Sequence, residues 1–253
     1  MSRMRGPNLR AAVADGDLQF ARFLPSTLTL LGLCCGATAI RFALSANWKA
    51  AVTAIVLAAI FDVLDGGVAR LFGADSEFGA QLDSLADLVS FGIAPAMLVY
   101  TWTLHYAGGA GWAMALIFCV CCAIRLARFM IESTNHDEDA PPEPFFVGVP
   151  TPAAACLILL PMIVSFQFHD AVFANPVVTM AMIAATSLLM ISRVPTPSLK
   201  GIHLTRHTRG PVTAFAGVLL GFAVLWPWST LTVSLIVYLA GIPAAVAIAR
   251  EDR

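Results

Sequence analysis

The sequence predicts an all-α membrane protein, a polytopic bundle of about eight transmembrane helices. Apolar residues make up 58% of the 253 residues and charged residues only 12%, about half the roughly 25% of ordinary soluble domains. The mean hydropathy is +0.80. Helices follow because an open sheet would leave backbone polar groups unpaired in lipid. This composition argues against a soluble enzyme, and the formal net charge of -1 gives no case for a nucleic-acid partner.

Eight apolar stretches carry this prediction. Most of them are close to the roughly 20 residues that a helix needs to cross a bilayer, and the fifth, sixth and seventh are shorter. We place the eight stretches at 24–44, 50–72, 80–104, 110–130, 150–167, 175–192, 211–227 and 229–249.

Lys and Arg residues gather on one predicted side of the membrane. If the N-terminus is cytoplasmic and every stretch spans, 13 of the 15 Lys and Arg residues fall inside. Only Arg41 and Lys49 flank an outer loop. The positive-inside rule therefore predicts an N-in and C-in chain with an even number of spans, and six spans satisfy it as well as eight.

The two ends of the chain are more polar than the centre. Residues 1–23 form a predicted cytoplasmic segment, in which residues 11–23 favour a short interfacial helix. Asp15 and Asp17 interrupt this segment, so we do not expect a signal peptide. Residues 201–253 are expected to form a cytoplasmic basic loop and a C-terminal helix pair.

All of the cysteines lie within predicted spans. No loop outside the membrane holds a pair for a disulfide, and no suitable set of His or Cys points to zinc. Buried apolar thiols are therefore the expected state. The six residues are Cys34, Cys35, Cys119, Cys121, Cys122 and Cys156.

Four aspartates interrupt the second and third apolar stretches. A charged Asp at the centre of a membrane helix costs roughly 2.5–3.5 kcal/mol, so each needs a counter-charge or a function. Asp62 and Asp65 are three residues apart and share one helix face. Asp83 and Asp87 are four apart and do the same. If the helices run antiparallel about a turn at 73–75, both pairs reach one depth near the cytoplasmic side.

Clustered carboxylates need positive charge, and Arg70 supplies only one unit. Oxygen-only ligands suit hard divalent cations, so two Mg²⁺ or Mn²⁺ ions would balance the four charges. Such ions commonly share their coordination with substrate phosphates, which indicates displacement at phosphorus. Gly66, Ala69 and Gly79 leave space for a ligand beside the carboxylates. Close packing of two membrane helices is the alternative explanation for these small residues.

A cation or proton transporter would also hold carboxylates inside the membrane. Such a protein needs polar residues at the midplane and an exit on the outer side. In this chain the acids cluster near the cytoplasmic end, whereas the outer halves of the stretches are rich in Leu, Val and Ala. A transporter is therefore the weaker alternative, as is a lipid-binding scaffold without activity.

One motif joins the aspartates to the small residues. It is Asp62-x2-Asp65-Gly66-x2-Ala69-Arg70-x8-Gly79-x3-Asp83-x3-Asp87. This motif resembles the signature of the CDP-alcohol phosphotransferase family. The resemblance implies a homodimeric, multi-pass enzyme of the cell (inner) membrane, with a family core over 24–200 and an active site that faces the cytoplasm. In that family an alcohol attacks a CDP-linked lipid and CMP is released.

The resemblance also implies roles for individual positions. The four aspartates would hold two divalent cations, Mg²⁺ or Mn²⁺, and Asp87 would also act as the catalytic base. The CDP-lipid site would include Asp62, Asp65, Gly66, Ala69, Arg70, Gly79, Asp83 and Thr29.

Longer runs of sequence resemble the phosphatidylserine synthase branch of the family. They cover residues 24–29, 83–96, 125–129 and 148–154. Ser26 and Gly32 depart from the pattern, because asparagines are expected there. The branch implies that L-serine attacks CDP-diacylglycerol to give phosphatidylserine and CMP. Glycerol-3-phosphate, inositol and choline are the rival acceptor alcohols.

Arg125 and Arg128 are the candidates for holding the acceptor. They lie three residues apart at the predicted cytoplasmic end of the fourth stretch. A guanidinium group pairs well with carboxylates and phosphates, so one of them could hold the serine carboxylate or a phosphate. Anchoring of the helix at the positive-inside interface is an equally weighted alternative.

Overall fold

The computed structural model describes residues 9–72, 76–134, 146–168, 172–192, 195–196, 217–218 and 221–251. Helices account for nearly all of these residues, which confirms the prediction of an all-α membrane protein. The turn expected at 73–75 and the basic loop expected after residue 200 lie outside the described residues.

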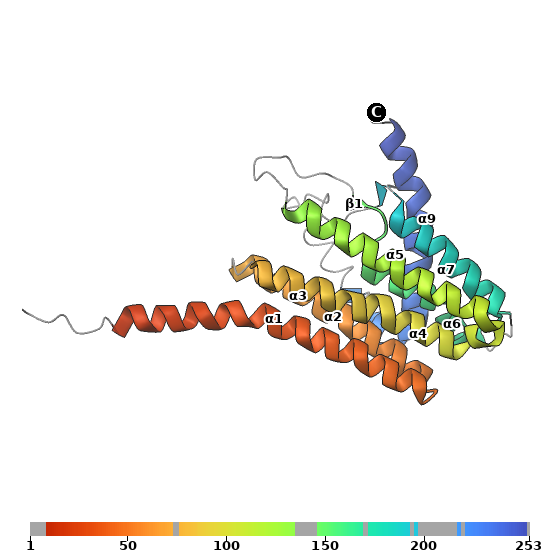
Figure 1. Ribbon diagram of the computed structural model, residues 1–253, viewed down its shortest axis with the longest axis horizontal. Helices are drawn as coiled ribbons and strands as arrows, with labels where there is room; N and C mark the ends of the chain where they lie inside the picture. The colour runs from red at the N-terminus through yellow and green to blue at the C-terminus, as the bar shows by residue number, and fades with distance from the viewer. Residues whose placement is uncertain are drawn as a thin grey trace, which may run out of the picture.

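Helices that follow the apolar stretches build the bundle shown in Figure 1. The α-helices are α1 (Leu9–Leu44), α2 (Trp48–Phe72), α3 (Glu77–Asp87), α4 (Ala94–Trp102), α5 (Gly108–Thr134), α6 (Thr151–Phe168), α7 (Pro176–Ile191) and α9 (Pro227–Glu251). A π-helical segment, η1 (Leu88–Ile93), joins α3 to α4, and a short 3₁₀ helix, η2 (Leu104–Ala107), precedes α5.

Several of these helices have the length and apolarity of membrane spans. They are Phe23–Leu44, Trp48–Leu71, Glu77–Trp102, Leu104–Ile131 and Thr151–Phe168, and two shorter apolar helices are Pro176–Ile191 and Pro227–Pro243. Of the stretch predicted at 211–227, the structure describes residues 217–218 and 221–227. The chain is therefore a multi-pass membrane protein, whereas its N-in and C-in orientation stays a prediction.

The first helix packs against both of the helices that bear the aspartates. In Figure 1, α1 lies alongside α2, and it also contacts α3, η1 and α4. The approach of α1 to α2 is close at Gly32, where an added Cβ would lie 3.5 Å from Phe61 Cβ. Small residues permit such an approach between membrane helices. As a result, α2 and α3 both lie against α1.

The third span begins at a defined cap and changes its winding in the middle. Ser76 Oγ accepts a hydrogen bond from the Gly79 amide at 3.0 Å, which satisfies a free donor in the first turn of α3. After Asp87 the winding widens into the π-helical η1, and α4 then continues the same span. Segments of this kind are frequent at functional sites.

Two details differ from the sequence prediction. Residues 11–23 do not form a separate interfacial helix but belong to α1, which runs unbroken through Pro25. Membrane helices tolerate proline, so Pro25 did not mark a boundary. The second detail is an antiparallel pair of two-residue strands, β1 (Phe146–Val147) and β2 (Pro195–Thr196), in an otherwise helical structure.

Candidate active site

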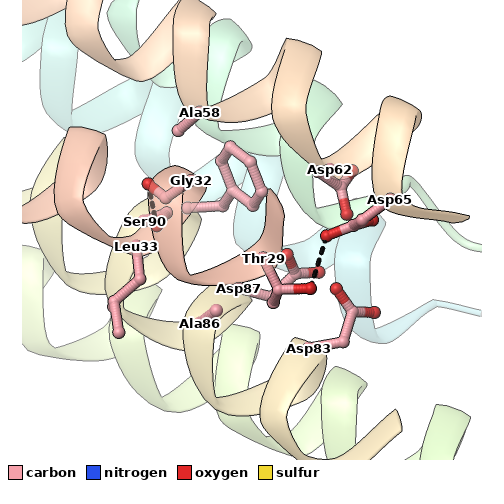
Figure 2. A pocket seen from close by; sticks show the side chains of 11 residues that line it. Thr29, Gly32, Leu33, Ala58, Asp62, Asp65, Asp83, Ala86, Asp87 and Ser90 are labelled. Carbon is pink, nitrogen blue, oxygen red and sulfur yellow. Dashed lines mark hydrogen bonds between the residues drawn. The ribbon is translucent and has the colours of Figure 1, made fainter. Parts of the chain in front are cut away.

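The structure places the four aspartates around one pocket. Carboxylate oxygens of Asp62, Asp83 and Asp87 lie within 4.8 Å of one another. Asp65 lines the same pocket, and Figure 2 shows the four side chains pointing toward a common centre. Two of them come from α2 and two from α3, so the acid pairs of the two helices meet at one depth.

The carboxyl groups of the pocket are only partly accessible to solvent. Asp65 is 5% exposed, and the other three aspartates are half-buried. The carboxyl groups of Asp62, Asp83 and Asp87 are each subject to the negative charge of neighbouring aspartates. Charges interact more strongly in such a site than in bulk water. The clustered carboxylates therefore favour the binding of a cation.

Thr29 on α1 orients one of these carboxylates. Its Oγ1 donates a hydrogen bond to Asp65 Oδ2 at 2.7 Å, and both side chains are buried (Figure 2). The same hydroxyl lies 3.1 Å from the carbonyl oxygen of Pro25, one turn earlier. Thr29 was predicted to bind the CDP-lipid, and the structure places it in the pocket lining with its hydroxyl bound to Asp65.

The donor atoms of the pocket suit a hard divalent cation. The aspartates offer carboxylate oxygens, and none of the described residues that line the pocket is His or Cys. Oxygen donors in this number are typical of sites for Mg²⁺, Mn²⁺ or Ca²⁺, whereas zinc prefers nitrogen and sulfur. The acidic cluster can therefore hold a metal ion of the hard class.

The other motif residues lie next to the pocket rather than in its lining. Around Gly66 the space is open, because an added Cβ would meet nothing within 4 Å. Ala69 is half-buried one turn further along α2. Arg70 is exposed, and its Nε donates back to Gly66 O at 3.0 Å. Gly79 packs on the cap residue Ser76 at the start of α3. Their predicted contacts with nucleotide stay predictions.

The two arginines have different hydrogen-bond partners in the structure. Arg125 Nη1 donates to Thr151 Oγ1 at the start of α6, and its charge acts on the Asp87 carboxyl group. Arg128 is exposed, and its Nη1 donates to the carbonyl oxygen of Ile191 at the end of α7, at 3.0 Å. Arg125 therefore lies near enough to Asp87 for their charges to interact, whereas Arg128 binds a carbonyl group at the end of α7.

Several residues that line the pocket were not among the predicted site residues. Helical spacing from residues already chosen could have found some of them, because Gly32 follows Thr29 by three and Ala58 precedes Asp62 by four. The additional lining residues are Gly32, Leu33, Ala58, Ala86, Ser90 and Phe91.

The cysteines are all free. Cys121 and Cys122 are buried, as predicted, but Cys34 is exposed on α1. The expectation of buried thiols was wrong for Cys34, because this face of α1 is not covered by the other described helices. In a bundle of this size, much of the apolar helix surface instead faces outward.

Comparison with known proteins identifies the family of the chain. Residues 22–191 match the family model described as CDP-alcohol phosphatidyltransferase. The CDP-diacylglycerol–serine O-phosphatidyltransferase of Mycobacterium leprae (strain TN) is 37% identical over 225 residues, which cover 89% of this chain and 75% of that protein. The enzyme of the same name from Bacillus subtilis (strain 168) is 35% identical over 179 residues, 70% of this chain and 92% of that protein.

The matched region contains every aspartate of the pocket. The chain also covers three quarters of its mycobacterial relative, so the likeness is not confined to a short motif. The family match, the extent of the relatives and the gathered carboxylates lead to one assignment. The chain belongs to the CDP-alcohol phosphatidyltransferase family.

Proposed function

We propose that this protein transfers the phosphatidyl group of CDP-diacylglycerol to L-serine, which gives phosphatidylserine and CMP. The proposal rests on one observation: carboxylate oxygens of Asp62, Asp83 and Asp87, on two helices that qualify as membrane spans, lie within 4.8 Å of one another. The choice of serine rests on relatives that are named for that acceptor.

The aspartates would bind two Mg²⁺ or Mn²⁺ ions together with the diphosphate of the lipid. Bound divalent cations supply positive charge that stabilises the diphosphate as the leaving CMP develops negative charge. Asp62, Asp65, Asp83 and Asp87 would hold these ions through carboxylate oxygens, and Thr29 keeps Asp65 in place. The open space at Gly66 leaves room for the nucleotide, near Ala69, Arg70 and Gly79.

Asp87 would act as the general base. Its carboxylate takes the proton of the serine hydroxyl while that oxygen bonds to the phosphorus next to diacylglycerol. The bond between this phosphorus and the bridging oxygen breaks, and the electron pair leaves with CMP. A positioned base of this kind typically contributes 10²–10⁴-fold to a rate.

Arg125 would hold the carboxylate of serine. It is the arginine whose charge acts on Asp87, so an acceptor bound to it would have its hydroxyl beside the base. Thr151 fixes the guanidinium from the start of α6. Of the two arginines that were predicted to bind the acceptor, we therefore favour Arg125.

The enzyme would work in the cell inner membrane, with the pocket open to the cytoplasm where serine and CMP are soluble. The distribution of Lys and Arg supports this orientation. A homodimer is part of the proposal because the family resemblance implies it. Light scattering of the purified full chain in detergent tests this point, and a monomeric mass would contradict it.

An assay with each candidate alcohol tests the proposed function. The purified chain is supplied with CDP-diacylglycerol, Mn²⁺ and either serine, glycerol-3-phosphate, inositol or choline. Release of CMP and formation of the lipid product are both measured. We expect products with serine only. Turnover with another alcohol would contradict serine as the acceptor but support the transfer reaction. No turnover with any of the four alcohols would contradict the proposed transfer.

A further inference from the structure

A very close contact between α1 and the third span lies just beyond the aspartates. Gly36 faces Ser90 of η1 so closely that an added Cβ would lie 2.6 Å from Ser90 Cα and 2.7 Å from Ser90 Cβ. Real Cβ atoms essentially never approach other heavy atoms this closely. Because one of these atoms belongs to the backbone, a side-chain rotation could not relieve the clash. Only glycine at position 36 allows this arrangement.

Ser90 is also bound to α1 by its hydroxyl. Its Oγ donates to the carbonyl oxygen of Gly32 at 3.3 Å, and the residue is 2% exposed. Gly32 and Gly36 are four residues apart, so they lie on one face of α1 and receive Ser90 between them. Figure 2 shows this bond beside the carboxylates.

The opposite side of η1 is held by α5. An added Cβ on Gly92 would lie 3.0 Å from Cys122 Sγ, and the Cys119 thiol lies 3.7 Å from Gly92 O. The π-helical segment is thus enclosed between α1 and α5. Interiors packed in this way have few alternative positions open to them. The start of η1, which follows Asp87 directly, is therefore fixed relative to α1.

The same face of α1 fixes the carboxylate of the second span. Thr29, three residues before Gly32, holds Asp65 of α2. One face of α1 thus contacts both spans that bear the acid pairs. Thr29 contacts the second span, and Gly36 contacts the third. Ser90 lies three residues after Asp87, about one turn away, so a shift of Ser90 would carry Asp87 with it.

We propose that Ser90, seated on Gly36, is a positioning residue that holds the Asp87 carboxylate in register with Asp62 and Asp83. The inference rests on the proposed function for the role of Asp87 as a metal ligand and base. Ser90 itself need not touch substrate, because its effect is transmitted through the turn of helix that joins it to Asp87.

The test compares two variants with a matched control in the full-length protein. Gly36→Ala adds the clashing Cβ, and Ser90→Ala removes only the hydroxyl. Gly109→Ala makes the same change as Gly36→Ala at an exposed helical glycine where a Cβ meets nothing within 4 Å. Binding of Mn²⁺ without substrate is measured by electron paramagnetic resonance, and kcat and both KM values are measured separately.

Gly36→Ala should weaken Mn²⁺ binding about 10-fold or more, in the range seen when the support of a metal ligand is lost. Its kcat should fall at least as much, while the KM for serine stays within about 2-fold of wild type, since Arg125 is untouched. Ser90→Ala should change the same quantities in the same direction by less. Gly109→Ala should match the wild type.

Folded Gly36→Ala protein with wild-type Mn²⁺ affinity and kcat would overturn the inference, as would equal effects of Gly36→Ala and Gly109→Ala. If Gly36→Ala does not fold, the inference is tested by Ser90→Ala alone. A wild-type Mn²⁺ affinity and kcat in Ser90→Ala would then overturn the inference. A wild-type protein that binds Mn²⁺ but transfers nothing would defeat the proposed function instead. The two failures are therefore distinguishable.

Discussion

Thr29 on the first helix donates a hydrogen bond from Oγ1 to Asp65 Oδ2 on the second helix, at 2.7 Å and out of contact with solvent. Partners that orient a metal ligand typically account for 10–100-fold in metal affinity or activity. We therefore expect Thr29→Val to weaken Mn²⁺ binding about 10-fold, whereas Thr29→Ser, which keeps the hydroxyl, should stay close to wild type. Titration calorimetry with Mn²⁺ measures the difference, and equal affinities in the two variants would contradict it.

The proposed base is tested by Asp87→Asn, which keeps the shape of the side chain but cannot accept the proton. We expect CMP release to fall by at least about 10²-fold, while membrane insertion and yield are unchanged. Glu77→Gln, on the exposed first turn of the same helix α3, is the matched change of an acid to its amide and should keep full activity. Rates are followed by CMP release, and normal turnover by Asp87→Asn would remove the base assignment.

Removal of divalent metal should abolish turnover. EDTA is expected to stop CMP release, and Mg²⁺ or Mn²⁺ in excess should restore it, because the carboxylates alone cannot neutralise the diphosphate. Metal should also stabilise the protein without substrate, by about 2.7 kcal/mol at 100 times the dissociation constant. A thermal unfolding scan with and without Mn²⁺ measures this. Activity indifferent to EDTA, together with an unchanged unfolding temperature, would contradict the metal site.

The two arginines should separate in their effect on the acceptor. Arg125→Lys keeps the charge but loses the paired donors of the guanidinium group. Loss of about 1.4 kcal/mol of a charge-assisted hydrogen bond corresponds to a 10-fold higher KM for serine, with the KM for CDP-diacylglycerol unchanged. Arg128→Lys should leave the KM for serine near wild type, because Arg128 binds Ile191 O. Steady-state kinetics, with each substrate varied in turn, measure these KM values. A raised KM for serine in Arg128→Lys but not in Arg125→Lys would assign the acceptor site to Arg128.

Much of the candidate site was predictable because it depends on local spacing. Residues three or four apart share a helix face, so the acid pairs could be recognised without coordinates. Their similar distances from the turn that the sequence predicts at 73–75 indicated that they lie at one depth. The apolar stretches likewise predicted the spans within a few residues, since the thickness of a bilayer sets the length of a helix.

Contacts that depend on how the helices rotate against one another were not predictable. Nothing in the local pattern tells which face of α1 meets Asp65, or that Gly36 receives Ser90. Likewise, two arginines one turn apart looked equivalent until α6 and α7 supplied different partners for them. Such contacts join residues far apart in the chain, and they arise only when several helices are packed together.

The amino-acid sequence by itself thus determined a helical membrane protein with two acid pairs facing each other, because helical periodicity and bilayer thickness act on short segments. The tertiary structure alone decided which side chains hold those acids in place. That choice depends on the packing of α1 against α2 and η1, where close approach of backbones and single buried hydrogen bonds select one arrangement among many with the same local pattern.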